Sequence, residues 1–193
     1  MISSEMKAVR NLGRAIGFLF LIFTPLLASA QVGPEMRGPV TIHLFGNYTY
    51  GSSNWSNNDS AGYTLGGFVQ LPHLFGLESR GSYLHWGTNE HRYDALFGPR
   101  VALHFARFSP YGVVLGGVGH VVVWHTASPH YNVLTGETAP EWKVLGGVDF
   151  YAGRHFTLRL GEVSYAKVYV FQNGVSPIDF SGGVVYRIPV REH

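Results

Sequence analysis

The segment IDFSGGVVYRIPV, residues 178–190, decides how this chain folds. Every second position from Ile178 to Val190 is apolar or glycine, whereas the alternate positions begin with Asp179 and end with Arg187. Such a period of two indicates a β-strand, because successive side chains of a strand point to opposite faces. One face of this strand is therefore apolar along its whole length, and the other face carries small and charged side chains.

Seven earlier segments show related alternation, so we predict eight strands. They cover residues 40–51, 61–71, 74–86, 92–105, 110–124, 141–152, 155–171 and 178–190. The alternation is poor in residues 110–124, where Val and Gly occupy both faces. In residues 155–171 it breaks at Glu162, and a bulge near Gly161 would turn Glu162 to the face that holds the other charges. In a single domain of 193 residues, little chain remains to cover so many apolar faces, so we expect lipid to cover them.

The charged residues of the strands are sorted to the face opposite the aliphatic one. A charge on a lipid-facing strand position costs about 2–4 kcal/mol at mid-membrane, so this sorting predicts that the charged face is the barrel interior. An eight-stranded barrel is only wide enough to be filled by side chains, and buried unpaired charges are costly. We therefore expect a closed, salt-bridged lumen. Its predicted charge network is Glu78, Arg80, Asp94, Arg100, Lys143, Asp149, Arg159, Glu162, Asp179 and Arg187.

Aromatic residues concentrate near the strand ends, which predicts two girdles at the membrane interfaces. Near the loops we place Tyr48, Tyr50, Tyr63, Tyr93, Trp124 and Trp142. Near the turns we place Phe75, Phe105, Tyr111, Phe150, Phe156 and Tyr186.

The connections between the predicted strands alternate in length. Those near Pro72, Phe108 and Gly153 are tight, residues 87–91 are intermediate, and those after the first, fifth and seventh strands are longer and polar. Short turns at one end, longer loops at the other and an even strand number are typical of bacterial outer-membrane barrels. We expect the termini in the periplasm and the loops of residues 51–60 and 125–140 outside.

The N-terminal residues are interpreted as a cleavable signal peptide. Lys7, Arg10 and Arg14 precede an apolar core at residues 16–27 and the small residues Ala28-Ser29-Ala30. The alternative is a membrane anchor, but the core is shorter than the roughly 20 residues that a spanning helix needs. We divide the chain into a signal peptide (1–30), a short lead (31–39), the barrel (40–190) and a C-terminal tail (191–193).

Composition excludes several other functions. The formal charge of +2 is small and the basic residues are evenly spaced, so we expect no nucleic-acid partner. Cysteine is absent, which excludes disulfides and thiolate chemistry. Several of the ten histidines, among them His85, His91 and His120, fall near one rim, but without a tight ligand motif. We expect no metal and no cofactor.

Several short motifs resemble those of the single-domain OmpA-like and OmpX-like outer-membrane β-barrel proteins. They are Glu78-x-Arg80, Gly98-Pro99-Arg100, Pro110-Tyr111 and residues 182–188. The resemblance covers residues 40–188. It implies an all-β, eight-stranded, antiparallel up-and-down transmembrane barrel in the bacterial outer membrane.

The same resemblance implies the partners of the chain. Ser181, Gly183, Tyr186 and Ile188 are similar to the C-terminal signal read by the barrel-assembly machinery. That signal usually ends in an aromatic residue, whereas here Pro189 and four further residues follow Ile188. Implied partners are outer-membrane lipid, lipopolysaccharide, the assembly machinery and periplasmic chaperones, around a monomer.

The function that we expect is non-enzymatic: envelope integrity or surface contact through the loops at residues 51–60 and 125–140. One alternative is a lipid A deacylase-like hydrolase, because His125, Ser128, His130 and Glu137 share one predicted loop. A narrow pore is another. A soluble lipocalin-like carrier is the third, although it would fill its interior with the aromatic and aliphatic face of every strand. We expect no catalytic residues.

Overall fold

The computed structural model describes residues 40–53, 59–71, 74–86, 89–105, 107–128, 131–153, 155–171 and 174–188. The predicted signal peptide, the lead and the C-terminal tail lie outside these residues. Within the described ranges, no helix is long and apolar enough to cross a membrane.

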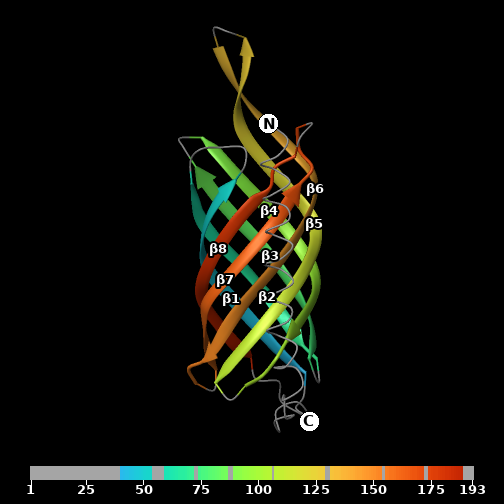
Figure 1. Ribbon diagram of the computed structural model, residues 1–193, viewed down its shortest axis with the longest axis vertical. Helices are drawn as coiled ribbons and strands as arrows, with labels where there is room; N and C mark the ends of the chain where they lie inside the picture. The colour runs from blue at the N-terminus through green and yellow to red at the C-terminus, as the bar shows by residue number, and fades with distance from the viewer. Residues whose placement is uncertain are drawn as a thin grey trace, which may run out of the picture. The chain divides into compact units, whose positions relative to one another are not determined.

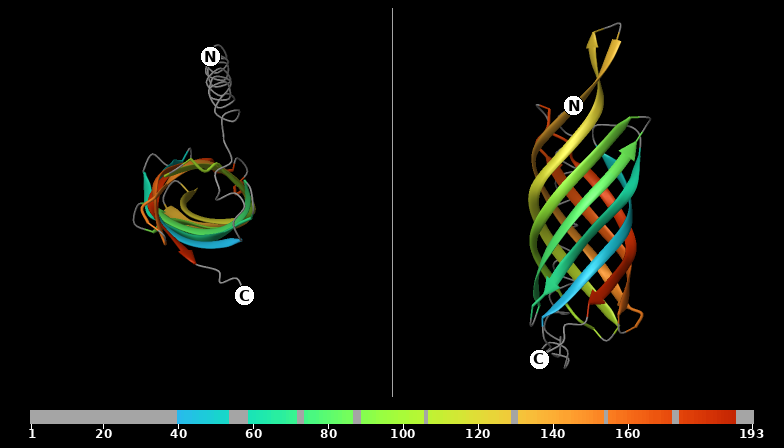
Figure 2. Two further views of the ribbon diagram at one scale, coloured as in Figure 1. Left: turned by 90° about the horizontal axis from the view of Figure 1, so that it is seen from below. Right: turned by 180° about the vertical axis from the view of Figure 1, so that it is seen from behind.

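Eight antiparallel strands form one closed barrel. In chain order they are β1 Thr41–Ser53, β2 Ser60–Gln70, β3 Phe75–Trp86, β4 Glu90–Ala102, β5 Phe108–Ser128, β6 Tyr131–Tyr151, β7 Phe156–Val168 and β8 Pro177–Ile188. Each strand pairs with the next, and β8 closes the barrel against β1 (Figures 1 and 2). The predicted up-and-down topology is confirmed. We call the end with the β2–β3, β4–β5 and β6–β7 connections the turn end, and the opposite end the loop end.

Side chains alternate between the lumen and the outer surface with the predicted parity. Along β3, for example, every side chain from Glu78 to Trp86 on one parity is buried, and its neighbours face outward. The outward positions carry large apolar groups, such as Tyr48 (66% exposed), Phe75 (60%) and Leu65 (57%). A soluble lipocalin-like carrier would have its apolar side chains inside the barrel and its charged side chains outside, so that alternative is wrong.

A bulge interrupts β7 where the sequence predicts it. Val148 pairs with Gly161 while the next residue, Asp149, pairs with Arg159, so β7 contains one extra residue at this point. The pairing with β8 shifts at the same place, between Arg159 and Glu162. The bulge returns Glu162 to the lumen, where it is 2% exposed.

The prediction of a loop at residues 125–140 is wrong. β5 continues to Ser128 and β6 begins at Tyr131, so both strands have 21 residues, whereas the others have 11 to 13. β4 pairs with β5 only as far as Val122, and β7 pairs with β6 only from Glu141. Residues 123–128 and 131–140 therefore form a two-stranded extension, the β5–β6 ribbon, which projects beyond the loop end (Figure 1). The prediction failed because the segment combines polar residues with strand-forming ones.

Other strand ends differ by a few residues. β4 ends at Ala102, not at residue 105, and β7 ends at Val168, not at residue 171. Of the loop at residues 51–60, the described part continues β1 to Ser53 and begins β2 at Ser60.

Two aromatic belts encircle the outer surface. Near the loop end, Tyr63, Tyr83, Tyr93 and His120 follow one another on β2 to β5, with ring centroids 5.5, 5.0 and 6.3 Å apart. Near the turn end, Phe108 lies 5.2 Å from Phe150, and Phe156 lies 5.3 Å from Tyr186. The belts agree with the prediction in general, but Tyr111 is wrong: its side chain is buried in the lumen. The side chain of Trp124 lies outside the described residues.

Candidate functional site

The lumen is the candidate site, and a network of six charged residues fills its turn-end half. It contains three acids and three bases: Glu78, Asp149, Glu162, Arg80, Arg100 and Arg159. Arg80 pairs with Glu78 and reaches Glu162 at 2.7 Å, across the barrel from β3 to β7. Arg100 joins Glu78 at 2.8 Å to Asp149 at 2.9 Å. We call this set the lower network; its formal charge is zero.

Three aromatic side chains hold the arginines of the lower network. The Arg100 guanidinium lies 4.1 Å from the Phe68 ring centroid and 3.7 Å from that of Tyr111. Arg159 lies 4.5 Å from the Phe45 centroid, and Tyr111 donates its hydroxyl hydrogen to Glu162 at 2.7 Å. Stacked arginines keep their planar forks free for carboxylates, so these rings add rigidity and attraction without competing for the acids.

A ladder of hydroxyl groups lies between the two halves of the lumen. Thr49 is 2.9 Å from Thr64 and 3.0 Å from Ser181, and Thr64 donates to Ser82 at 3.1 Å. The backbone N–H of Ser82 then donates to Asp94 at 3.0 Å. Small hydroxyl side chains therefore satisfy one another at this level of the lumen.

A second group of charges, the upper network, occupies the loop-end half. Arg92 pairs with Asp179 at 2.6 Å, and Lys143 pairs with Asp94 at 2.7 Å. Lys143 also lies 3.7 Å from Glu141 and 3.9 Å from Asp179. Three acids thus face two bases. Both carboxylate oxygens of Glu141 are buried and have no hydrogen-bond partner among the described residues.

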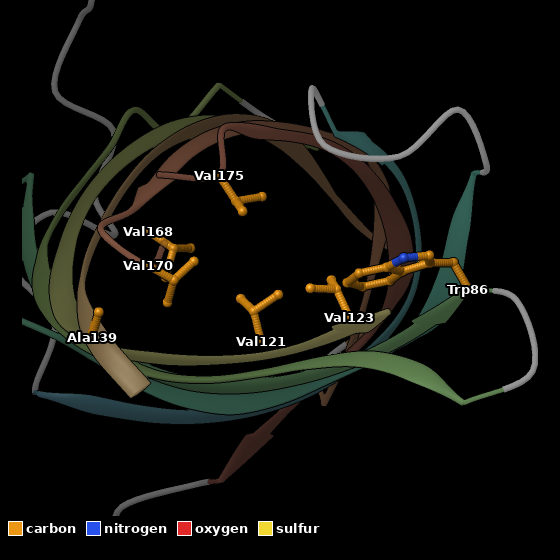
Figure 3. Packing of buried hydrophobic residues seen from close by; sticks show 7 residues of the cluster. All are labelled: Trp86, Val121, Val123, Ala139, Val168, Val170 and Val175. Carbon is orange, nitrogen blue, oxygen red and sulfur yellow. The ribbon is translucent and has the colours of Figure 1, made fainter. Parts of the chain in front are cut away.

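An apolar cluster, the apolar cap, lies in the lumen at the loop end, above the upper network. Seven buried side chains from five segments point toward one another there (Figure 3): Trp86, Val121, Val123, Ala139, Val168, Val170 and Val175. Val168 and Val175 are joined by backbone hydrogen bonds, which bring the β7–β8 connection onto the cap. The lumen therefore contains, from the turn end to the loop end, the lower network, the hydroxyl ladder, the upper network and the cap.

Nine of the ten predicted charges lie in these two networks, and Arg187 does not. It is half-buried at the turn end, and no carboxylate of the described chain lies within ion-pair distance of it. Its place in the predicted network is therefore wrong. The reason is its distance along β8 from Asp179: it lies beyond the layer where the carboxylates gather.

Three residues of the two networks and their aromatic contacts were not predicted from the sequence: Arg92, Glu141 and Tyr111. Two of them carried a signal. Arg92 precedes Asp94 by two residues, and Glu141 precedes Lys143 by two residues, so strand parity alone placed both inside. Tyr111 lies on β5, where apolar residues on both faces conceal the parity.

The residues of the alternative chemistries are only partly described. The backbones of His125 and Ser128 belong to β5 within the ribbon, but their side chains are not among the described ones. His130 lies outside the described residues. The Glu137 carboxylate accepts a hydrogen bond from the backbone N–H of Phe171 at 2.7 Å. In the described part of the chain, no three His, Asp or Glu residues are arranged to hold a metal ion. His85 and His91 are paired residues of β3 and β4 on the outer face.

Comparisons with known proteins support the fold. No family model matches the sequence, and no curated protein matches it. Among solved structures, the chain is similar to the neisserial surface protein A, with 12% identity and a TM-score of 0.59 over 76% of this chain and 96% of that one. It is also similar to Ail, the attachment invasion locus protein of Yersinia pestis, determined with the heparin analogue sucrose octasulfate. That match has 14% identity and a TM-score of 0.51 over 77% of this chain and 97% of Ail. This chain therefore has the fold of the small eight-stranded transmembrane barrels of bacterial outer membranes.

Proposed function

We propose that this chain is a bacterial outer-membrane barrel with a closed lumen, which supports the envelope or contacts other molecules through its surface and conducts no solute. The observation that carries the proposal is the filling of the lumen along its length, by the lower network, the upper network and the apolar cap. Opening a path would separate buried ion pairs, and breaking one such pair costs about 3–5 kcal/mol.

Planar-bilayer recording of the purified protein tests the closed lumen. We expect no steady conductance from the native protein. A large, steady current would contradict the proposal and favour the narrow pore. Migration on a gel with and without boiling in detergent is the companion measurement, because a folded membrane barrel migrates differently from its unfolded chain.

We place the surface role on the β5–β6 ribbon. Beyond Val122 and before Glu141, its strands pair mainly with each other, so their outer edges present backbone N–H and C=O groups. Among the described residues, the β7–β8 connection donates hydrogen bonds to Pro140 and Glu137 of the ribbon. Exposed edges of this kind can accept an additional strand from another molecule. A variant without residues 125–132 should keep the heat-modifiable barrel and lose any surface binding that the native protein shows.

We propose that Ser181, Gly183, Tyr186 and Ile188 form the assembly signal of the chain. Tyr186 is 42% exposed on the outer face at the turn end, against Phe156. Tyr186→Ala should slow insertion by the assembly machinery in reconstituted vesicles more than Phe156→Ala does. Phe156→Ala is the matched control, because it removes the same ring contact outside the signal. Equal rates for the two variants would contradict this role.

We also propose that the chain is not a lipid hydrolase. The support is the placement of His125 and Ser128 in a paired ribbon and the engagement of Glu137 by a backbone N–H. Acyl release from lipopolysaccharide by the purified protein is the measurement. Release that disappears in His125→Ala and Ser128→Ala would overturn the proposal.

A further inference from the structure

The upper network holds one carboxylate for which no base remains. Arg92 pairs with Asp179 at 2.6 Å, and Lys143 pairs with Asp94 at 2.7 Å. The third acid, Glu141, lies 3.7 Å from the Lys143 ammonium, which is too far for a hydrogen bond. Neither of its carboxylate oxygens has a hydrogen-bond partner among the described residues. Both bases are therefore used by other acids, and Glu141 is left over.

The side chain of Glu141 is buried in the lumen at the loop end, where it is 3% exposed. On one side lies Gly119 of β5, where a Cβ would overlap with the Glu141 carboxylate. On the other side lies Val168 of β7, which is directly paired with Glu141 and belongs to the apolar cap. A buried carboxylate without hydrogen bonds is costly when it is charged, and it becomes neutral by binding a proton.

The other charges around Glu141 already balance one another. They come from its own strand, from β4 and from β8: Lys143, Arg92, Asp94 and Asp179. On the two strands adjacent to β6, the facing positions are Gly119 and Val168, which carry no charge, and His120 points outward into the aromatic belt. Two bases and two acids sum to zero. An ionised Glu141 would therefore leave this buried layer with one uncompensated negative charge.

We propose that Glu141 is a proton-binding site of the folded barrel. A proton from water binds to one carboxylate oxygen, and the upper network becomes neutral while its two close ion pairs stay as they are. In the unfolded chain a glutamate side chain is exposed and ionises at about pH 4.3. Above that pH, folding therefore takes up one proton. The site makes the stability of the barrel depend on pH, which goes beyond the closed lumen and the surface role proposed above.

Urea unfolding of the full-length protein from lipid vesicles, repeated at a series of pH values, tests the site. The matched variant is Glu141→Gln, which keeps the shape of the side chain and is neutral at every pH. Between about pH 5 and 6, the folding equilibrium constant of the native protein should fall relative to that of the variant by up to about tenfold per pH unit, the limit for one proton held only by the folded state. All titrating groups that the two proteins share cancel in this ratio.

Glu162→Gln in the lower network is the control, and its expected pH dependence has the opposite sign. Glu162 is paired with Arg80 and Arg159, so the folded barrel holds it ionised. The ratio of native to variant folding constants should stay level between about pH 5 and 6 and fall only at lower pH, where the unfolded chain takes up a proton before the paired carboxylate does.

A level ratio for Glu141→Gln between about pH 5 and 6 would overturn the proposal. So would a ratio that follows the concentration of magnesium ions at fixed pH and ionic strength, because a cation would then neutralise the carboxylate. The infrared spectrum is a second readout: at about pH 6 the native protein should show the carbonyl stretch of a protonated carboxylic acid, and Glu141→Gln should lack it. Absence of this band from the native spectrum would contradict the site. Heat-modifiable migration of each variant verifies that it is folded.

Discussion

The lower and upper networks of the lumen arise from the same strand parity, yet they differ in how well their charges are balanced. In the lower network three acids meet three bases, and each arginine reaches two carboxylates. In the upper network Asp94, Glu141 and Asp179 share Arg92 and Lys143, so one acid is in excess. Alternation therefore determines which face a charge occupies, but it does not determine whether that charge finds a partner.

The lower network also has the more favourable surroundings. Aromatic rings of Phe45, Phe68 and Tyr111 lie against the guanidinium groups of the lower network. Glu141 instead lies near Gly119 and the Val168 side chain of the apolar cap. A buried carboxylate without a hydrogen bond gains little from its burial, whereas a stacked and paired arginine is held from several sides. We therefore expect the lower network to stabilise the barrel and the upper one to contribute much less.

The largest expected effect follows from removing one base of the lower network. Arg80→Met leaves Glu78 and Glu162 buried with fewer partners, so the free energy of unfolding should fall by about 3–5 kcal/mol. Urea unfolding from lipid vesicles measures it. Arg107→Met, at an exposed turn position, is the control and should change stability by less than about 0.5 kcal/mol. A comparable loss in both variants would mean that the pairing contributes nothing specific.

A smaller effect is expected from the hydroxyl group that joins the aromatic and charged parts of the lower network. Tyr111→Phe removes the donor to Glu162 and keeps the ring over Arg100, so it should cost about 1.5–3 kcal/mol in the same unfolding experiment. Tyr93→Phe on the outer belt removes the same atom from an exposed side chain, and we expect almost no change there. If the two variants lose equal stability, the hydroxyl of Tyr111 has no special role.

The smallest effect, and one of opposite sign, is expected in the upper network. Glu141→Gln removes the excess negative charge from a side chain without hydrogen-bond partners in the described chain, so stability should stay constant or rise by up to about 1 kcal/mol. The counterpart, Glu162→Gln in the lower network, should lower stability by more than about 1 kcal/mol, because it weakens bonds to Arg80 and Arg159. Equal destabilisation by the two substitutions would remove the distinction between the networks.

Much of the architecture was predictable from the sequence, because burial in a barrel has a period of two. Parity placed Glu78, Arg80 and Lys143 inside, and the glycine at position 161 predicted the bulge that turns Glu162 inward. The pairing of these charges was not predictable. Arg80 and Glu162 lie on strands that are not neighbours, so their contact depends on the shear and curvature of the closed sheet.

The errors have three physical causes. Where a strand carries apolar residues on both faces, as β5 does around Tyr111, parity gives no orientation. Polarity alone does not distinguish a loop from a strand in the β5–β6 ribbon. Both faces of a two-stranded ribbon can be solvated, so its strands can be polar on both faces. Arg187 shows a third limit: its face was predicted, but its height along the barrel relative to the acids was not.

The distribution of the lower network among the strands has a consequence for the order of folding. All six of its charges come from β3, β4, β6 and β7, and none comes from β1 or β8, which form the closing seam. In a flat sheet, Arg80 and Glu162 would be separated by the width of three intervening strands. Their bond forms only when the central strands have curled, and it can do so before β8 meets β1. The interior charges can therefore set the curvature of the growing sheet, so that the two edges are already near each other when the seam closes.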